Sequence, residues 1–378
     1  MVYLDNAATT LIKPSAVARS MASAVKTLAS PGRGGHEASM LAAQKAYDCR
    51  EASAALFNVS TPENVIFTMN ATHALNIAIH SLAKKGSRTV VSGYEHNSVM
   101  RPLYSIGADI RIARSMLFDR SDTVESFQRE LHRGADLVVC THISNVFGFI
   151  LPVREIAALC ADYCVPLIID ASQSAGVEEI SIKELGANYI AMPGHKGLYG
   201  PQGTGLLLVG ENVNSNPFIC GGSGSNSELM DMPDFYPDRL EAGTHNMPGI
   251  AGLLEGIRFV EKNGTLNIKQ HERKLTDLAY KLLREIKGLT PYYTEDPELQ
   301  GGVLSFSTDA MSSEDCAEKL SDLGIAVRAG LHCAPTAHIS AGTNKKGSVR
   351  ISMSAFNTDD DIYALSDALK IIMSKNYK

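Results

Sequence analysis

A lysine and an aspartate stand at the ends of two consecutive apolar segments of the chain. Lys196 lies in the sequence MPGHKG, directly after apolar residues 189–192, and Asp170 follows apolar residues 165–169. Charged groups at the ends of buried strands are costly unless they meet a ligand or each other. Pyridoxal phosphate (PLP) needs such a pair, because the lysine forms the Schiff base and the acid keeps the pyridinium nitrogen protonated. A structural ion pair is the alternative.

A predicted strand-to-helix junction offers a site for the phosphate of that cofactor. Residues 67–74 read FTMNATHA. Free backbone N–H groups and the helix dipole make the start of a helix an anion site. Thr72 could add a hydroxyl donor, and His195 could add a second donor. The alternative is that Asn70 or Thr72 only caps the helix.

Four further side chains follow or lie within predicted strands. His96 could stack on a pyridine ring, although a histidine at a helix start or on the surface is the alternative. Asn145 could bond a ring hydroxyl or a substrate carboxylate, and Gln173 is a weaker candidate for the same task. Arg350 suits bidentate capture of a carboxylate, with a structural salt bridge as the alternative.

One of the seven cysteines has basic neighbours. Cys333 lies in the sequence RAGLHCAP, in a loop after a predicted strand. Arg328 and His332 would favour its thiolate, which is the nucleophilic form; an incidental exposed thiol is the alternative. Cys160 and Cys164 are expected to be inert core residues, and their spacing lacks the further ligands that zinc needs, so no metal site is predicted.

Composition excludes several classes of function. The chain has 378 residues, a net charge of -6 and 44% hydrophobic residues. It carries no basic tract, so no nucleic-acid partner is expected. Neither a signal peptide nor an apolar run long enough for a bilayer is apparent, so no membrane association is expected. An odd number of cysteines without scaffold spacing fits a reducing cytoplasm.

Short apolar segments alternate with segments of helical period over the first two thirds of the chain. This rhythm predicts an α/β fold with a mostly parallel sheet that helices cover on both faces. Ligands bind outside the carboxyl ends of such strands, where Asp170 and Lys196 both lie. The expected strands are residues 65–68, 89–92, 109–113, 137–141, 166–170, 189–192 and 205–209, and the expected helices are residues 71–84, 123–133 and 153–163.

The pattern changes after residue 243, where a smaller α+β unit is expected. We expect a large domain at residues 14–250 and a small C-terminal domain at residues 251–378, joined by the N-terminal segment 1–13. The expected elements of this part are helices at residues 247–263, 266–287, 312–323 and 358–374, and strands at residues 302–307, 325–328 and 348–352.

The order of these motifs resembles the class V group of PLP enzymes, which have the type I fold. The resemblance runs from YLDNAATT at residues 3–10 to Arg350 and the sequence FNT that follows it. Within this group the chain is similar to the cysteine desulfurases and selenocysteine lyases. The short segment from Arg328 to Cys333, in the pattern RxGxHCA, is typical of their group II branch.

The resemblance implies an activity. L-cysteine would become L-alanine while Cys333 takes the sulfur as a persulfide and passes it to an acceptor protein or a small thiol. Lys196, Cys333 and His96 would be the catalytic residues. Alternatives are a selenocysteine lyase acting on L-selenocysteine, a C–S lyase or aminotransferase on the same scaffold, or a non-catalytic cofactor-binding protein.

The resemblance also implies binding roles and a homodimer. The residues it assigns to PLP are Lys196, Asp170, Gln173, His96, Ala71, Thr72, His195 and Thr244, the last reaching the partner's phosphate; those it places around the substrate are Asn145, Arg350, Arg328 and His332.

Two positions depart from the pattern of the family. Pro193 stands where well-known members have a serine that helps to bind phosphate. Leu331 stands where many group II members have a second histidine. The first change would weaken cofactor contacts. The second would alter how Cys333 is activated, or which acceptor or chalcogen is preferred.

Overall fold

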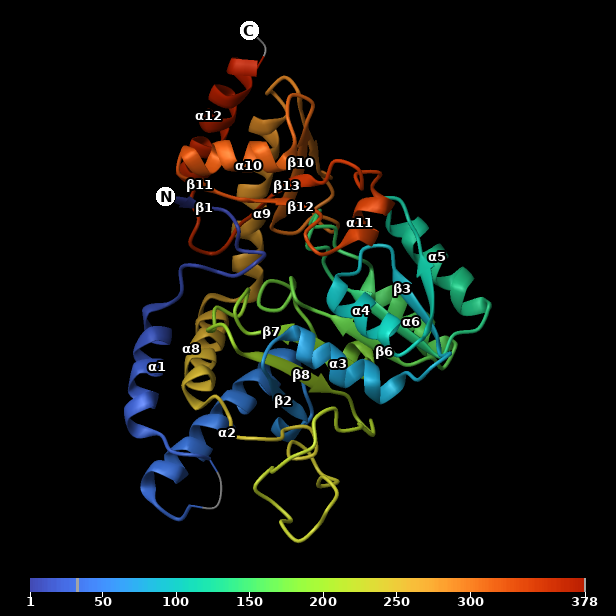
Figure 1. Ribbon diagram of the computed structural model, residues 1–378, viewed down its shortest axis with the longest axis vertical. Helices are drawn as coiled ribbons and strands as arrows, with labels where there is room; N and C mark the ends of the chain where they lie inside the picture. The colour runs from blue at the N-terminus through green and yellow to red at the C-terminus, as the bar shows by residue number, and fades with distance from the viewer. Residues whose placement is uncertain (32–33, 377–378) are drawn as a thin grey trace.

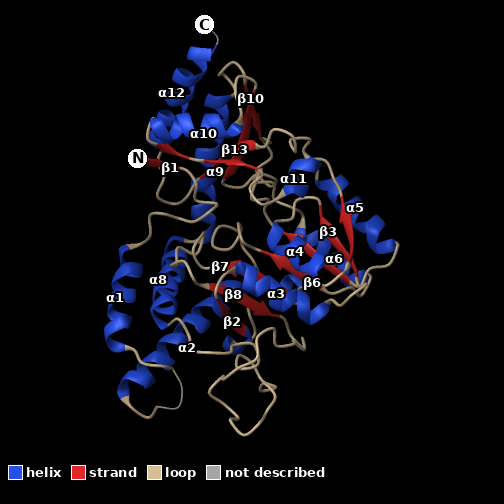
Figure 2. Ribbon diagram, in the orientation of Figure 1, coloured by secondary structure: helices blue, strands red, loops and turns tan. Residues whose placement is uncertain are grey.

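The computed structural model describes residues 1–31 and 34–376, and its larger sheet has seven strands (Figure 2). Their order is β2-β8-β7-β6-β5-β3-β4, and β8 alone runs antiparallel to its neighbours. The mostly parallel α/β sheet that the sequence predicts is thus confirmed. Its strands are β2 (Val65–Thr68), β3 (Arg88–Ser92), β4 (Asp109–Ala113), β5 (Leu137–Thr141), β6 (Leu167–Asp170), β7 (Tyr189–Pro193) and β8 (Gly205–Val209).

Helices cover both faces of this sheet. Successive residues of a strand point to opposite faces, and both faces carry apolar side chains that must be buried. Val90 packs in one buried cluster with Phe127 of α5, whereas Val91 packs in another with Leu75 of α3. None of the helices in the described residues combines the length and apolar character needed to cross a membrane. The helices of this part are α1 (Ser15–Thr27), α2 (Glu37–Phe57), a 3-10 turn (Pro62–Asn64), α3 (Ala71–Leu82), α4 (Asn97–Ser105), α5 (Arg120–His132), α6 (Val153–Asp162), α7 (Ile182–Leu185) and α8 (Met247–Asn263).

The C-terminal part forms a second sheet with its own buried core (Figure 1). Four antiparallel strands follow the order β12-β13-β10-β9. Helix α8 packs along α1 and extends across residue 250, so the boundary between residues 250 and 251 stays a prediction. The elements are α9 (Thr265–Leu283), β9 (Leu289–Tyr292), β10 (Val303–Thr308), α10 (Ser313–Asp322), β11 (Ile325–Ala326), β12 (Arg328–Gly330), α11 (Pro335–Ser340), β13 (Ser348–Ser352) and α12 (Asp359–Asn376).

The first residues of the chain connect the two units. β1 (Val2–Tyr3) pairs in parallel with β11 of the small unit. The Asn6 side chain donates to the Ser352 carbonyl at 2.8 Å, and the Thr10 amide donates to the His195 carbonyl at 3.1 Å. The N-terminal segment therefore lies against both units at the level of the predicted site.

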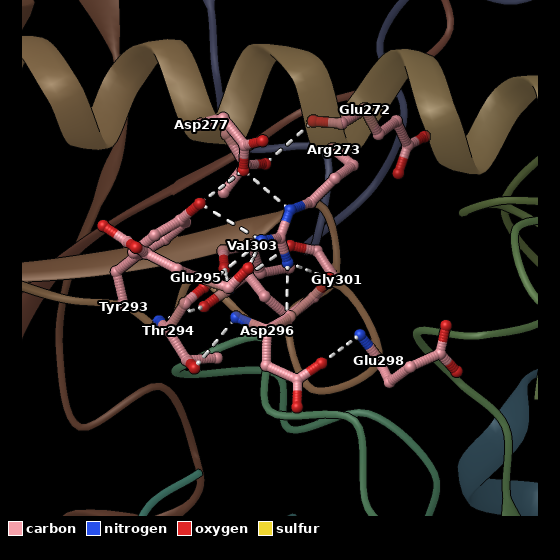
Figure 3. Close-up of polar contacts among 12 residues, drawn as sticks. Glu272, Arg273, Asp277, Tyr293, Thr294, Glu295, Asp296, Glu298, Gly301 and Val303 are labelled. Carbon is pink, nitrogen blue, oxygen red and sulfur yellow. Dashed lines mark hydrogen bonds and ion pairs between the residues drawn. The ribbon is translucent and has the colours of Figure 1, made fainter.

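A second connection is made by an arginine in α9 (Figure 3). Arg273 pairs with Asp277 at 2.6 Å and donates to backbone carbonyls of the loop 294–300. At the end of this loop, the Gln300 side chain donates to the Phe147 carbonyl at 3.1 Å. The small unit thus holds the loop that follows β5, which carries one of the predicted substrate residues.

Candidate active site

A cavity of about 190 Å³ lies at the carboxyl ends of β5, β6 and β7 and extends to β12 and β13 of the small unit. It contains every predicted site residue except Cys333 and Thr244. Those residues are Ala71, Thr72, His96, Asn145, Asp170, Gln173, His195, Lys196, Arg328, His332 and Arg350.

Lys196 and Asp170 lie in this cavity, as their positions after β7 and β6 predict. Burial lowers the pKa of Lys196 to about 8, while the charge of Asp170 acts in the opposite direction. The Asp170 carboxylate accepts hydrogen bonds from the amide and the hydroxyl of Ser172, at 2.9 and 2.5 Å. An amine with this pKa is partly neutral near pH 7 and is therefore nucleophilic.

His96 is a neutral ring at the start of α4. Its Nδ1 accepts the Ser98 amide at 3.0 Å, so the proton of the ring lies on Nε2. Burial lowers the pKa of His96 to about 4, and the positive charge of Lys196 adds to this effect. A neutral ring suits stacking on an aromatic cofactor.

The end of the cavity beside α3 is rich in hydrogen-bond donors. Asn70 is the helix cap, and its side chain accepts the His73 amide at 2.9 Å. The preceding amides, those of Ala71 and Thr72, lie in the first turn, where helices leave donors unpaired. His195 has a buried Nδ1 without a hydrogen-bond partner among the described residues. This arrangement suits an anion such as phosphate.

The same cavity also carries a buried arginine. Arg350 donates to the Asn145 carbonyl at 2.9 Å and to the Asp5 carboxylate at 2.6 Å. Its Nε is buried and finds no partner in the described residues. The salt bridge that the sequence left as an alternative is thus present, yet donor groups of the guanidinium remain available. Arg328 lines the same cavity and is exposed.

The Cys333 loop lies beside the cavity. Cys333 is exposed, and both it and His332 have left-handed backbone angles, with φ of 56° and 49°. The Asn97 amide donates to the Cys333 carbonyl at 2.8 Å, and the Asn145 side chain donates to the His332 carbonyl at 2.8 Å. These bonds fix the loop against α4 and the segment after β5.

His332 does not activate Cys333 by charge, contrary to expectation. Burial and the charge of Arg350 lower the pKa of His332 to about 2, so the ring is neutral. Its Nε2 contacts the Ser348 carbonyl at 3.1 Å and therefore carries the proton. Only Arg328 among the two proposed neighbours can favour the thiolate electrostatically.

The other cysteines separate into buried and exposed groups. Cys160 is buried, and burial raises its pKa to about 12, which agrees with an inert core thiol. Cys164 is exposed, so its placement in the core was wrong; α6 ends at Asp162, before this residue. Among the described residues, no group of three or more His, Cys, Asp or Glu could hold a metal ion.

Thr244 lies outside the Lys196 cavity of its own chain. It is exposed and lines a separate cavity of about 220 Å³. Gln173 also differs from expectation in one respect, because its side-chain amide donates to the Ala7 carbonyl at 3.0 Å. Its place in the cavity nevertheless agrees with the prediction.

Two residues near the site were not singled out from the sequence. Asp5 was quoted only as part of a motif, and its pairing with Arg350 spans most of the chain. Glu95 is fully buried next to His96 and accepts hydrogen bonds from Ser92 and from the Thr141 amide, at 2.5 and 2.8 Å. Burial raises the pKa of Glu95 to about 8. A charged residue type between two apolar strands was the signal that could have revealed it.

Comparison with known proteins agrees with this fold and site. The Aminotransferase class-V family matches residues 2–365. A probable cysteine desulfurase of Methanothermobacter thermautotrophicus is 34% identical, with 98% of this chain and 94% of that protein covered. A protein with the same description from Pyrococcus abyssi is 31% identical, over 96% and 92%.

A solved structure has the same architecture. The apo structure of cysteine desulfurase from Thermococcus onnurineus superposes with a TM-score of 0.90 and 29% identity, covering 99% of this chain and 95% of that one. The chain belongs to the class V aminotransferase family, a family of PLP enzymes, and its curated relatives are described as cysteine desulfurases. The resemblance found in the sequence is confirmed.

Proposed function

We propose that the chain is a PLP-dependent cysteine desulfurase, which converts L-cysteine to L-alanine and transfers the sulfur to Cys333. The observation that carries this proposal is the arrangement of one cavity. Lys196 and Asp170 share this cavity with a donor-rich helix start and the buried Arg350, and the exposed Cys333 lies on an adjoining loop.

The residues present fit PLP. Lys196 would hold the cofactor, Asp170 would pair with its pyridinium, and His96 would stack on its ring. The unpaired Nδ1 of His195 and the first amides of α3 would receive its phosphate. When bound, PLP supplies an electron sink for the carbanion formed at the substrate Cα.

The buried Arg350 would bind the substrate carboxylate. Its guanidinium keeps donor groups free beside Asn145, and the buried Nε would gain an acceptor there. The Lys196 amine, with a pKa near 8, would take the proton from Cα of the bound amino acid. Ring nitrogens of His96 and His332 stay neutral and do not compete for this proton.

Cys333 would complete the reaction as a nucleophile. Its thiolate attacks the substrate sulfur, so an S–S bond forms while the substrate C–S bond breaks. The electron pair of that bond stays with Cβ, which takes up a proton and yields alanine. The persulfide on Cys333 then passes to an acceptor thiol of a protein or a small molecule. A reducing cytoplasm would keep Cys333 available as a thiol.

A homodimer is part of this proposal. Several large apolar side chains are exposed on the segment between β8 and α8, and they need a covering surface. A second copy of the chain would supply it and would bring Thr244 to the neighbouring phosphate site. The exposed residues are Phe218, Ile219, Leu229, Met230 and Phe235.

Alanine release from L-cysteine, with a reductant present, tests the proposed function. We expect wild-type protein to form alanine and Cys333→Ala to form none. Cys164→Ala is the matched control, since it removes another exposed thiol, which follows α6 outside the proposed site, and should leave turnover unchanged. Sulfur transfer through Cys333 would be contradicted if wild type and Cys333→Ala formed alanine at the same rate, or if neither protein formed alanine. L-selenocysteine and a β-elimination substrate would then be assayed next.

A further inference from the structure

A buried ion pair lies away from the Lys196 cavity. Arg50 of α2 and Glu241 are 7% and 6% exposed. The two nitrogens of the guanidinium donate to the two carboxylate oxygens, at 2.8 and 2.6 Å. This is the bidentate geometry in which a carboxylate is held in one orientation.

Two further contacts fix the same carboxylate, and a third fixes the guanidinium. The Phe67 amide in β2 donates to Glu241 at 2.6 Å, and His245 Nε2 lies 3.2 Å from its other oxygen. The Arg50 guanidinium lies 4.1 Å from the centre of the Phe67 ring. Residues of both α2 and β2 therefore hold Glu241 in place, and the Arg50–Glu241 pair acts as a clamp on the long segment between β8 and α8.

Such a pair needs a reason other than stability. Removing two charges from water is costly, and apolar pairs of similar volume are often at least as stabilising. Arg50 and Glu241 lie outside the cavity that contains Lys196, so they do not touch its contents. What they do is hold the chain in register immediately before Thr244.

Thr244 is exposed and lies three residues after Glu241, at the end of the segment that the Arg50–Glu241 pair holds. The Gly243 amide donates to the Gly222 carbonyl at 2.7 Å, and Gly243 has a φ of +91°, a left-handed angle that favours glycine. Thr244 lines a cavity beside the exposed apolar residues Met69 and Ile219 rather than the Lys196 cavity. Thr244 therefore does not contribute to the Lys196 cavity of its own chain.

We propose that Arg50 and Glu241 are positioning residues that act in trans: they hold Thr244 so that its hydroxyl binds the cofactor phosphate in a second copy of the chain. This inference rests on the proposed PLP-dependent homodimer. Each chain would thus determine how tightly its partner, rather than itself, retains PLP.

Two mixed dimers test this inference, because they contain the same two substitutions in different arrangements. In the first, a Lys196→Ala chain is paired with a Glu241→Gln chain. In the second, a wild-type chain is paired with a chain that carries both substitutions. Chains with two different affinity tags allow each mixed dimer to be purified. The readout is PLP affinity at the single remaining lysine, followed by the visible absorbance of lysine-bound PLP.

The trans role predicts opposite behaviour of the two dimers. The first dimer keeps an intact Glu241 opposite its only Lys196, so its PLP affinity should equal that of wild type. The second has the substituted Glu241 opposite its Lys196, so its affinity should fall about tenfold, as for loss of one hydrogen bond to a charged group. The reverse order, or equal affinities in both dimers, would overturn the inference.

Further variants separate this inference from the proposed dimer and from misfolding. Thr244→Ala in the same two arrangements tests the shared site itself. If PLP affinity with Thr244→Ala is the same in both arrangements, the proposal of a shared site is wrong. If Thr244→Ala shows a difference between the arrangements and Glu241→Gln shows none, only the proposed positioning role is wrong. Should Glu241→Gln not fold, the paired change R50M with E241L removes the clamp without leaving a buried charge, and the same tenfold difference is expected.

Discussion

At the scale of single residues, the Lys196 amine determines how PLP attaches. Its pKa is lowered from 10.5 to about 8 by burial. Schiff-base formation needs the neutral amine. As the pH rises toward 8, the rate of reconstitution of cofactor-free protein should therefore increase about tenfold for each pH unit, and above pH 8 it should be constant. Stopped-flow absorbance after mixing with PLP measures this rate.

Asp170→Asn is the informative control for that profile. The negative charge of Asp170 raises the pKa of Lys196 against the effect of burial. Its removal should move the midpoint of the rate profile below 8. An unchanged midpoint would mean that Asp170 does not interact with the amine in the folded protein.

Arg350 presents a planar fork that a lysine cannot reproduce. Arg350→Lys should raise the KM for L-cysteine by about 10- to 100-fold, as for loss of a charge-assisted hydrogen bond of about 1.5–3 kcal/mol, with a smaller change in kcat. Steady-state kinetics of alanine formation measure both constants.

Arg328→Lys provides the comparison for this substitution. Arg328 lines the same cavity but is exposed, whereas Arg350 is buried against Asp5. The exposed position should therefore cost less in KM. A larger effect at Arg328 than at Arg350 would reverse the assignment of the carboxylate site.

At the scale of elements, the loop after β5 depends on one glycine. Gly148 has a φ of +69°, and a Cβ there would lie 2.2 Å from the Val303 carbonyl. Gly148→Ala should therefore destabilise the protein by more than the roughly 1–3 kcal/mol of a left-handed non-glycine residue. It should also raise KM, since the same loop carries Asn145. Urea denaturation and steady-state kinetics measure the two effects.

Gly86→Ala is the matched substitution. Gly86 has a φ of +80°, but a Cβ there would meet nothing within 4 Å. It should show the cost of the backbone angle alone and leave KM unchanged. If both variants lose equal stability, the contact between the β5 loop and β10 does not constrain the site.

The elements that the sequence predicted best are those with strong apolar runs. The seven strands of the large sheet were all expected, because buried strands read as continuous apolar segments. α5 begins at Arg120, three residues before expectation, since Asp119 caps it by accepting the Asp122 amide at 2.9 Å. The segment 325–328 divides into β11 and β12, which join different sheets.

Other elements carried no periodic signal. α2 was not predicted, since its buried residues are mostly small ones such as Ala42 and Ser53. β9 was missed because Pro291 argues against a strand and only Leu289 of its four residues is buried. The antiparallel direction of β8 follows from its connection to β7, residues 194–204, which contains no helix to return the chain for a parallel strand.

The candidate site was predictable where its residues end strands. Asp170 and Lys196 follow apolar runs. The carboxyl ends of parallel strands lie at the same edge of a sheet, where ligands bind, so residues at these positions come together. The pairs Asp5–Arg350 and Arg50–Glu241 were not predictable, because nothing local in either partner indicates a contact so far away in the sequence. The neutral state of His332 likewise arises from tertiary burial.

At the scale of the whole molecule, a buried acid links stability to pH. Burial raises the pKa of Glu95 from 4.5 to about 8, so the folded state favours the protonated form. The contribution of this protonation to the free energy of unfolding is fully present below pH 4.5 and is lost as the pH rises through 8. The unfolding free energy of wild type, relative to Glu95→Gln, should therefore fall by up to about 1.4 kcal/mol for each pH unit in that window.

Denaturant unfolding at several pH values measures this difference, because other titrating groups cancel between the two proteins. The glutamine keeps the acceptor for Ser92 and the Thr141 amide, so the comparison isolates the proton. A difference that does not change with pH would show that Glu95 is ionised throughout the window.

The N-terminal segment has a consequence for how the molecule comes into being. Asp5 is synthesised long before its partner Arg350, and β1 must wait for β11 before it can pair. All strands of the large sheet precede residue 210, but the cavity also needs Arg328, His332 and Arg350. A nascent polypeptide that has not reached Arg350 would thus lack a finished site, so reactive chemistry is withheld until that residue has been added.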